Sequence, residues 1–231
     1  MKMKFAVIVF PGSNCDHDAL YALKKNLNVD AKFVWHRESD LSNYNAILIP
    51  GGFSYGDYLR TGCIASKSKI VNEVIKHGKN GGLILGICNG FQILIETGLL
   101  PGALLRNTKL KFLSKNVFLK VLNTNNIFCT NYKNKNIIEL PIAHNEGNFF
   151  GDKDLLKKLE DNNLIAFKYC DKNGKIGINS NPNGSLNNIA GILNDKKNIL
   201  GMMPHPERMV ENYLSGEDGS LFFENLINNL K

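Results

Sequence analysis

The chain has 231 residues, a formal net charge of +7 and five cysteines. This length predicts one large domain over residues 1–231. Irregular cysteine spacing excludes a disulfide framework and a C-x-x-C metal site, and it favours reduced thiols in the cytoplasm. The lysines are scattered without interleaved aromatic residues, so the charge indicates a solvated surface, or one that meets an acidic partner, and not a nucleic-acid-binding protein. No apolar run approaches the length of a membrane span. The apolar stretch after the first lysines is too short for a signal peptide.

The first half of the chain alternates apolar strands with amphipathic helices. Strands are expected at Lys4–Phe10, Ala31–Trp35, Ala46–Pro50 and Leu83–Ile87, and helices at Asp18–Leu27, at Ile64–Lys76 and from Cys88 to about Gly98. Apolar central strands separated by helices predict an open, mostly parallel α/β sheet of flavodoxin-like type with helices on both faces.

The second half changes character and predicts an antiparallel strand extension of this sheet. Short strands are expected at Asn116–Leu122, Asn126–Tyr132 and Ile137–Ile142, joined by turns rich in asparagine and lysine. Later elements are a helix at Asp152–Leu159, strands at Leu164–Tyr169, Ile189–Leu193 and Ile199–Met203, and a closing helix at Gly219–Leu230.

Cys88 stands in a distinctive setting, the segment Leu83–Gln92. An apolar strand runs into a G-x-C-x-G motif and then into a periodic apolar segment, which predicts a strand, a sharp turn and a helix with the cysteine on the turn. This is the thiol counterpart of a nucleophile elbow, in which small flanking residues permit strained backbone. A thiol at a helix N-terminus is favoured as the thiolate. The other four cysteines are expected to be core residues, and the motif alone leaves that alternative open for Cys88.

A second signal lies at Met203–Arg208, which contains the sequence His-Pro-Glu. A thiolate nucleophile needs a base, and that base needs an orienting partner. Residues two apart in extended backbone project to the same side, so Glu207 can hold one ring nitrogen of His205. Together with Cys88, this pattern favours a Cys-His-Glu catalytic triad over an exposed turn.

A third signal is the glycine-rich loop that follows the strand at Ala46–Pro50. Acyl chemistry places negative charge on a carbonyl oxygen, and N–H groups of a Gly-Gly turn can face such an anion. The expected oxyanion donors are the N–H groups around Gly51, Gly52 and Phe53, and the N–H group of Asn89, the residue after the nucleophile.

Taken together, these motifs resemble the class I, triad-type glutamine amidotransferases. The segments Phe10–Asp16, Val34–His36, Gly51–Arg60, Cys88–Gln92 and Pro141–Gly147 narrow the resemblance to the glutaminase subunits of phosphoribosylformylglycinamidine synthase. The matching segments run from residue 10 to residue 208, so the resemblance covers essentially the whole chain. One departure is Asn145, where that family usually has glycine; asparagine tolerates the positive φ that such a turn uses.

The resemblance implies a glutaminase that releases ammonia from glutamine through a Cys88 thioester. It also implies that Gln92 helps to bind glutamine. For His144 and Glu146 two roles stay open: they position the substrate or a partner, or they form a buried, hydrogen-bonded pair in a tight loop. The chain has no ATP-binding P-loop motif, so no cofactor is expected in it. By resemblance, a large synthase subunit with ATP and Mg²⁺ consumes the ammonia, and a small bridging subunit completes the complex.

Two other functions remain open from the sequence. One is a different enzyme on the same scaffold, either a stand-alone cysteine hydrolase or a glutaminase that serves another synthase. The other is a non-catalytic binding module of flavodoxin-like build, which the late His-Pro-Glu sequence disfavours because a binding module needs no oriented base.

Overall fold

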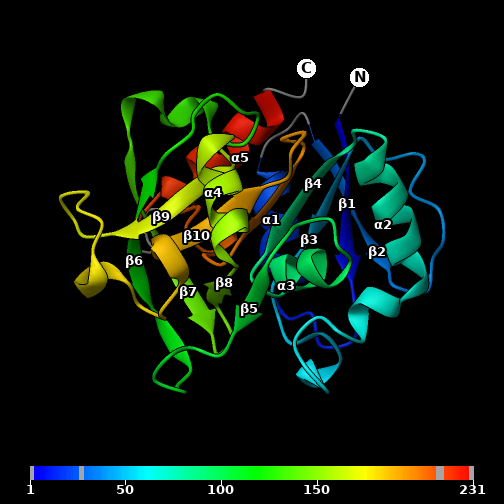
Figure 1. Ribbon diagram of the computed structural model, residues 1–231. Helices are drawn as coiled ribbons and strands as arrows, with labels where there is room; N and C mark the ends of the chain where they lie inside the picture. The colour runs from blue at the N-terminus through cyan, green and yellow to red at the C-terminus, as the bar shows by residue number, and fades with distance from the viewer. Residues whose placement is uncertain (1–2, 26–28, 212–215, 229–231) are drawn as a thin grey trace.

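The computed structural model describes residues 3–25, 29–211 and 216–228 (Figure 1). In these residues a nine-stranded sheet has the order β2-β1-β3-β4-β11-β10-β9-β6-β7, and β5 pairs separately with β8. From β2 to β11 the neighbouring strands are parallel, and from β11 to β7 they are antiparallel. The predicted fold class is therefore confirmed, with the antiparallel extension on the side of β11.

The parallel strands are β1 (Met3–Val9), β2 (Val29–Trp35), β3 (Ala46–Ile49), β4 (Leu83–Ile87) and β11 (Ile199–Met202). The remaining strands are β5 (Ala103–Leu105), β6 (Leu113–Val121), β7 (Ile137–His144), β8 (Asn148–Phe150), β9 (Ile165–Cys170) and β10 (Ile189–Leu193). The helices are α1 (Asp16–Lys24), α2 (Lys69–Lys79), α3 (Asn89–Glu96), α4 (Lys153–Asp161) and α5 (Asp218–Asn228).

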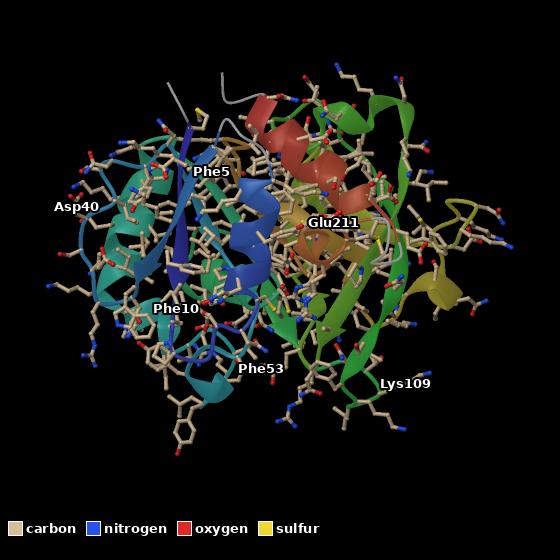
Figure 2. The ribbon with its side chains drawn as sticks, turned by 180° about the vertical axis from the view of Figure 1, so that it is seen from behind. Phe5, Phe10, Asp40, Phe53, Lys109 and Glu211 are labelled. Carbon is tan, nitrogen blue, oxygen red and sulfur yellow. The ribbon has the colours of Figure 1, made fainter. Side chains whose placement is uncertain are left out.

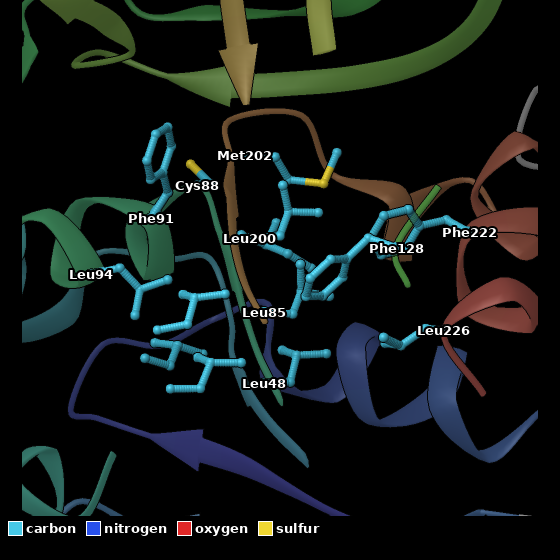
Figure 3. Packing of buried hydrophobic residues seen from close by; sticks show 14 of the residues in the cluster. Leu48, Leu85, Cys88, Phe91, Leu94, Phe128, Leu200, Met202, Phe222 and Leu226 are labelled. Carbon is cyan, nitrogen blue, oxygen red and sulfur yellow. The ribbon is translucent and has the colours of Figure 1, made fainter. Parts of the chain in front are cut away.

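Helices cover both faces of the sheet. In Figure 1, α2, α3 and α4 lie in front of the strands, and in Figure 2, seen from behind, α1 and α5 lie in front. Figure 3 shows apolar side chains packed on both sides of β4 and β11, Leu94 on one side and Phe222 and Leu226 on the other. Every residue of β4 is buried, which explains its continuous apolar run.

Two predicted elements differ from the structure. The helix expected at Ile64–Lys76 begins only at Lys69, because Ser68 has extended backbone as the N-cap residue and a separate 3-10 turn precedes it. The strand expected at Asn126–Tyr132 is absent from these described residues. The Asn126 side chain accepts a hydrogen bond from the Phe128 N–H group and donates one to the Asn123 carbonyl, and such local bonds compete with strand pairing.

Smaller differences concern the ends of elements and one short pair of strands. The sequence analysis missed the pair β5–β8. Helices α1 and α5 begin at Asp16 and Asp218, before the predicted positions, and the predicted ends Leu27 and Leu230 lie outside the described residues. No helix in the described part of the chain is long and apolar enough to cross a membrane.

Three neighbouring parallel strands deliver the residues singled out in the sequence to one edge. Ile49 of β3 pairs with Gly86 of β4, and Met202 of β11 pairs with Ile87. The segments that follow these strands therefore emerge side by side. Because the carboxyl ends of parallel strands form the ligand-binding edge of open α/β sheets, this register brings the three signals together.

Candidate active site

Cys88 occupies a strained turn between β4 and α3, with φ 50° and ψ −104°. The flanking glycines make this turn possible. A Cβ atom on Gly90 would lie 2.0 Å from the Ile49 carbonyl oxygen, and one on Gly86 would lie 2.5 Å from Leu94 Cδ1. Such strain in a non-glycine residue is typical of functional sites. The predicted elbow is therefore present, with the Cys88 sulfur 3.6 Å from the Ala143 carbonyl oxygen.

His205 and Glu207 form a buried pair beside Cys88. Nδ1 of His205 lies 2.6 Å from Oε1 of Glu207, and the His205 backbone N–H group donates to the Pro141 carbonyl. The expectation of extended backbone through both residues is wrong, because Pro206–Arg208 forms a 3-10 turn. A proline at the first position suits such a turn, and the two side chains still meet.

The electrostatics of this pair favour a protonated imidazole. Burial opposes the charged form of His205, but the Glu207 carboxylate and the thiols of Cys88 and Cys15 outweigh burial and raise the pKa of His205 well above its usual range. His205 can therefore hold a proton beside the Cys88 sulfur. This is the property that a proton shuttle for a thiol nucleophile requires.

The glycine loop lies directly against this pair. A Cβ atom on Gly51 would be 2.7 Å from Cε1 of His205, so a side chain there would displace the imidazole. Gly52 has φ 140°, in which an added Cβ would meet the backbone of Asn14. The structure therefore explains the Gly-Gly pair by close approach to its neighbours.

The predicted oxyanion donors are only partly available. The Phe53 N–H group donates to the Gly12 carbonyl at 2.9 Å, so in this conformation it does not face an anion, which corrects its predicted role. Asn89 is the first residue of α3, where helix geometry leaves N–H groups without a partner inside the helix. The Asn89 N–H group remains the donor best placed next to the nucleophile.

A cavity of about 270 Å³ adjoins the Cys88 sulfur. Residues from four separate segments of the chain line it: Gly52, Phe53, Asp57, Thr61, Cys88, Gln92, Arg106, Ala143, His144, Asn145 and Glu146. Six of the predicted site residues are in this set. The sequence analysis missed Asp57, Thr61 and Arg106 as site residues. Asp57 lies in the segment Gly51–Arg60, which could have pointed to it, but no sequence signal pointed to the other two.

Gln92 reaches the cavity from α3, as predicted. Its Nε2 group donates to the Glu146 carbonyl at 2.7 Å, and its Oε1 atom accepts from Nδ2 of Asn89 at 2.9 Å. The Asn89 side chain also accepts a bond from the Ser54 N–H group. Gln92 thus joins the helix after the nucleophile to the loop that follows β7.

His144 is the last residue of β7 and Glu146 lies in the loop that follows, and both line the cavity. Burial and the nearby His205 lower the pKa of His144 to about 3, so its imidazole is neutral, and Nδ1 lies 3.1 Å from Oδ1 of Asn107. Glu146 accepts a hydrogen bond from the Thr61 hydroxyl and pairs with Arg106 at 3.6 Å. Asn145 is not among the residues with positive φ, so the turn does not use the left-handed conformation that the sequence analysis expected asparagine to tolerate here.

Two acidic or thiol groups near the site have no counterpart in the predicted triad. Burial, followed by the charge of Glu146, raises the pKa of Asp57 to about 6. Cys15, expected in the core, is buried against the triad, and ligand atoms of Cys15, His205 and Glu207 lie within 4.8 Å of one another. In the described ranges this is the one such group of potential metal ligands. The short His205–Glu207 hydrogen bond accounts for it without an ion.

A larger groove of about 790 Å³ lies elsewhere, between the β6 strand and residues 170–182. It contains the Cys170 thiol, but no histidine lines it, and burial raises the pKa of this thiol to about 11. The groove therefore lacks an activated nucleophile. The cavity beside Cys88 differs from this groove because it combines a thiol with a neighbouring oriented imidazole.

Comparison with known proteins agrees with this geometry. Residues 2–217 match the model of the CobB/CobQ-like glutamine amidotransferase domain. The chain belongs to this family. It is 58% identical over 229 residues to phosphoribosylformylglycinamidine synthase subunit PurQ of Pelagibacter ubique, covering 99% of this chain and 100% of that protein. The resemblance drawn from the motifs is confirmed.

Solved structures extend the comparison to the fold. A chain in the structure of PurLQS from Thermotoga maritima is 43% identical, with a TM-score of 0.88 and full coverage of both chains. The glutaminase domain of CTPS from Trypanosoma brucei, with bound acivicin, is 12% identical with a TM-score of 0.62, covering 99% of this chain and 94% of that chain. At that identity the second likeness shows a shared fold alone.

Proposed function

We propose that this chain is the glutamine amidotransferase subunit, of PurQ type, of phosphoribosylformylglycinamidine synthase. It hydrolyses glutamine and passes ammonia to a synthase subunit, which converts phosphoribosylformylglycinamide to the amidine in purine biosynthesis. The observation that carries the proposal is a strained thiol, Cys88, at a cavity beside the buried His205–Glu207 pair. Full-length identity to a PurQ subunit supports it.

The first half-reaction forms a thioester. The Cys88 sulfur attacks the side-chain amide carbon of glutamine, and His205 holds the proton that the thiol gives up. The carbonyl oxygen becomes an oxyanion next to the Asn89 N–H group. His205 then donates its proton to the amide nitrogen, the carbon–nitrogen bond breaks, and ammonia leaves. Glu207 keeps the imidazole oriented and stabilises its positive charge throughout.

The second half-reaction regenerates the enzyme. His205, now neutral, removes a proton from a water molecule that attacks the glutamyl thioester carbonyl. The carbon–sulfur bond breaks, glutamate is released, and the proton returns to the Cys88 sulfur. The same imidazole thus acts as an acid and then as a base, because each step returns the proton that the next step needs.

The cavity also carries charges suited to the amino-acid end of glutamine. The carboxylates of Asp57 and Glu146 face it, so the substrate ammonium group meets negative charge, and the Arg106 guanidinium at the same cavity can pair with the substrate carboxylate. Gln92 lines the same cavity as these groups and Cys88, where it can contact the substrate. His144 stays neutral and shapes the cavity wall.

The complex supplies what this chain lacks. The ATP and Mg²⁺ needed for amidine formation belong to the large synthase subunit, and a small bridging subunit joins the two. The PurLQS structure from Thermotoga maritima supports this composition because it contains a 43% identical chain. We place the protein, as one domain over residues 1–231, in the cytoplasm, where its five free cysteines stay reduced.

The test follows nitrogen from glutamine to product. Purified chain, synthase and bridging subunits receive glutamine labelled with heavy nitrogen in the side-chain amide, together with unlabelled ammonium salt. We expect the amidine to carry the label far above its fraction in free ammonium, as judged by mass spectrometry. Two results would indicate a stand-alone hydrolase. One is an amidine labelled only to the fraction found in free ammonium, and the other is a glutamine turnover rate that is the same with and without the synthase subunits.

A further inference from the structure

The loop between β3 and the cavity has an unusual backbone. Three of its non-glycine residues, Tyr55, Asp57 and Leu59, have positive φ values of 56°, 53° and 69°, and Gly56 between them has φ 67°. Such conformations are unfavourable for residues with side chains and persist only where the surroundings enforce them. Several of them in succession require a strong external constraint.

One side of this loop forms part of the active site. Phe53 and Asp57 line the cavity beside Cys88. The Ser54 N–H group donates to Oδ1 of Asn89 at 3.2 Å, and Nδ2 of Asn89 lies 3.4 Å from Oδ1 of Asp57. Because Asn89 directly follows the nucleophile, the loop and the elbow hold each other in register.

The other side of the loop is anchored through the Tyr55 hydroxyl. Its oxygen lies 2.8 Å from Nδ1 of His36 and 3.0 Å from Oγ of Ser68. The Tyr55 backbone N–H group donates to the Pro11 carbonyl at 2.6 Å, and its ring packs edge-on against His36. Burial and Arg37 lower the pKa of His36, so the neutral imidazole can accept the tyrosine proton at Nδ1 while Ser68 donates to the tyrosine oxygen.

Each hydrogen-bond partner of the Tyr55 hydroxyl lacks an interaction that its side chain could otherwise make. Ser68 is the N-cap residue of α2, yet its side chain makes no capping hydrogen bond to that helix. His36 is 8% exposed, and its Nε2 atom is buried without a hydrogen-bond partner. A serine that caps its helix and an imidazole with both nitrogens hydrogen-bonded normally stabilise a protein. Here the side chains of Ser68 and His36 instead make their hydrogen bonds to the Tyr55 hydroxyl.

We propose that Tyr55 is a positioning residue of the glutaminase reaction, with its hydroxyl fixed between His36 and Ser68. This three-residue brace (His36, Tyr55, Ser68) holds the left-handed loop where Phe53, Ser54 and Asp57 complete the cavity and contact Asn89. The inference rests on the function proposed above. It gives a role to His36, which the triad chemistry does not use.

The test compares Tyr55→Phe with Tyr58→Phe, a matched loss of one hydroxyl from an exposed tyrosine of the same loop. In the assembled complex we expect Tyr55→Phe to lower glutamine-dependent kcat/KM by about tenfold to a hundredfold, because small misplacements near reacting atoms cost this much. Ammonium-dependent synthesis and the unfolding temperature should stay close to wild type. Tyr58→Phe should behave as wild type in all assays.

Chemical labelling distinguishes positioning from a general structural role. An electrophilic glutamine analogue needs the formed cavity, whereas iodoacetamide needs only an accessible thiol. We expect Tyr55→Phe to slow analogue labelling of Cys88 in step with kcat/KM and to leave iodoacetamide labelling near the wild-type rate. Ser68→Ala should act through the same brace, so the double variant should be no worse than Tyr55→Phe alone.

Three results would overturn the inference. Normal glutamine kinetics in Tyr55→Phe would show that the hydroxyl positions nothing. Equal loss of both labelling rates, with a lower unfolding temperature, would make Tyr55 a stability residue. Multiplicative losses in the double variant would separate Ser68 from the brace. If the wild-type complex itself fails to use glutamine, the proposed function fails and the inference falls with it.

Discussion

His205 and Glu207 are both buried, and each one stabilises the charged form of the other. Burying an ionised carboxylate is costly unless it is paired, and here the imidazole is its hydrogen-bonded partner. The same burial strengthens the interaction between them. Glu207 can therefore fix the orientation of the ring and favour its protonated form without taking part in proton transfer to the substrate.

This division of roles predicts unequal effects of substitution. His205→Ala should lower the glutamine hydrolysis rate of the complex by roughly 10²–10⁴-fold, the usual contribution of a general acid–base group. Glu207→Gln should cost less, because it keeps a polar group of the same length. The double variant should lose far less than the product of the single losses. Full multiplicativity, with assembly verified by gel filtration, would mean that the two residues do not act as a unit.

The five free cysteines allow a direct test of the nucleophile. Stoichiometric inactivation with an electrophilic glutamine analogue should modify Cys88 alone, because this thiol adjoins the cavity and a protonated imidazole. Cys15 is an internal control: it contacts the same imidazole but does not line the cavity. Peptide mapping that finds the label chiefly on Cys15 would make Cys15, and not Cys88, the nucleophile.

Asp57 links substrate binding to stability. Its pKa is about 6 in the folded chain, against 3.8 for an unperturbed aspartate, so between about pH 4 and pH 6 the folded state binds the extra proton. The free energy of unfolding therefore falls as pH rises through this window, and the loss persists above it. Asp57→Asn should be more stable than wild type by about 1–2 kcal/mol at pH 7.5, after allowance for partial exposure, and no more stable below pH 4.

Urea unfolding at several pH values measures this difference, and glutamine kinetics give its functional counterpart. The KM for glutamine should rise in Asp57→Asn if the carboxylate faces the substrate ammonium group. A variant that is less stable at pH 7.5, or equally stabilised at pH 4 and pH 7.5, would contradict the raised pKa.

Among the secondary structure elements, α5 packs against the turn that carries Glu207. Gly219 of α5 donates its N–H group to the Met209 carbonyl at 2.9 Å, and a Cβ atom there would lie 1.9 Å from the Pro206 carbonyl oxygen. The helix can therefore approach the Pro206–Arg208 turn this closely only with glycine at this position. The position of Glu207 on this turn therefore depends on how closely α5 packs against it.

Gly219→Ala should push α5 away from that turn. We expect a loss of about 1–3 kcal/mol in the free energy of unfolding, as for other overpacked sites. Glutaminase activity should fall by a larger fraction of its wild-type value than the free energy of unfolding does. Gly177→Ala is the matched control, because an added Cβ there meets nothing within 4 Å and its φ is not positive. Equal behaviour of the two variants in thermal unfolding and activity would show that the α5 contact is unimportant.

The sequence predicts the elements that carry a strong local pattern. β4 and β10 agree with their predicted bounds, and the elbow, the His205–Glu207 pair and the Gln92 side chain lie where the motifs indicate. Periodicity and motif spacing suffice for these because the determinants are adjacent in the chain. The segment at Asn126–Tyr132 is different. Its composition predicts a strand, but asparagine side chains form hydrogen bonds that close local turns there.

Other features depend on contacts between distant segments and are invisible to local reading. The Phe53 N–H group is bound by Gly12, about forty residues earlier in the chain, so its unavailability follows from packing of two loops. Asp57 and Arg106 enter the cavity from different loops, and Cys15 reaches the triad from the start of α1. Only the assembled sheet edge shows that they share one site.

For the molecule as a whole, the arrangement separates ammonia release from ammonia use. The Cys88 thiol lines the cavity, and the buried His205–Glu207 pair that we propose as its partner in glutamine hydrolysis lies beside it. We propose that activation of the acceptor takes place in the synthase subunit. Ammonia that becomes protonated in solution is lost as a nucleophile. The value of this chain to the complex therefore lies in delivering unprotonated ammonia to its partner.

The most direct test of this account is the ratio of two activities of the reconstituted complex that contains Cys88→Ala. Synthesis of the amidine from glutamine should be abolished, while synthesis from added ammonium salt should stay close to the wild-type rate. Complex formation is checked by gel filtration of the same sample. Loss of both activities in an intact complex would place this chain in the synthase chemistry, and retained glutamine-dependent synthesis would show that Cys88 is not the nucleophile.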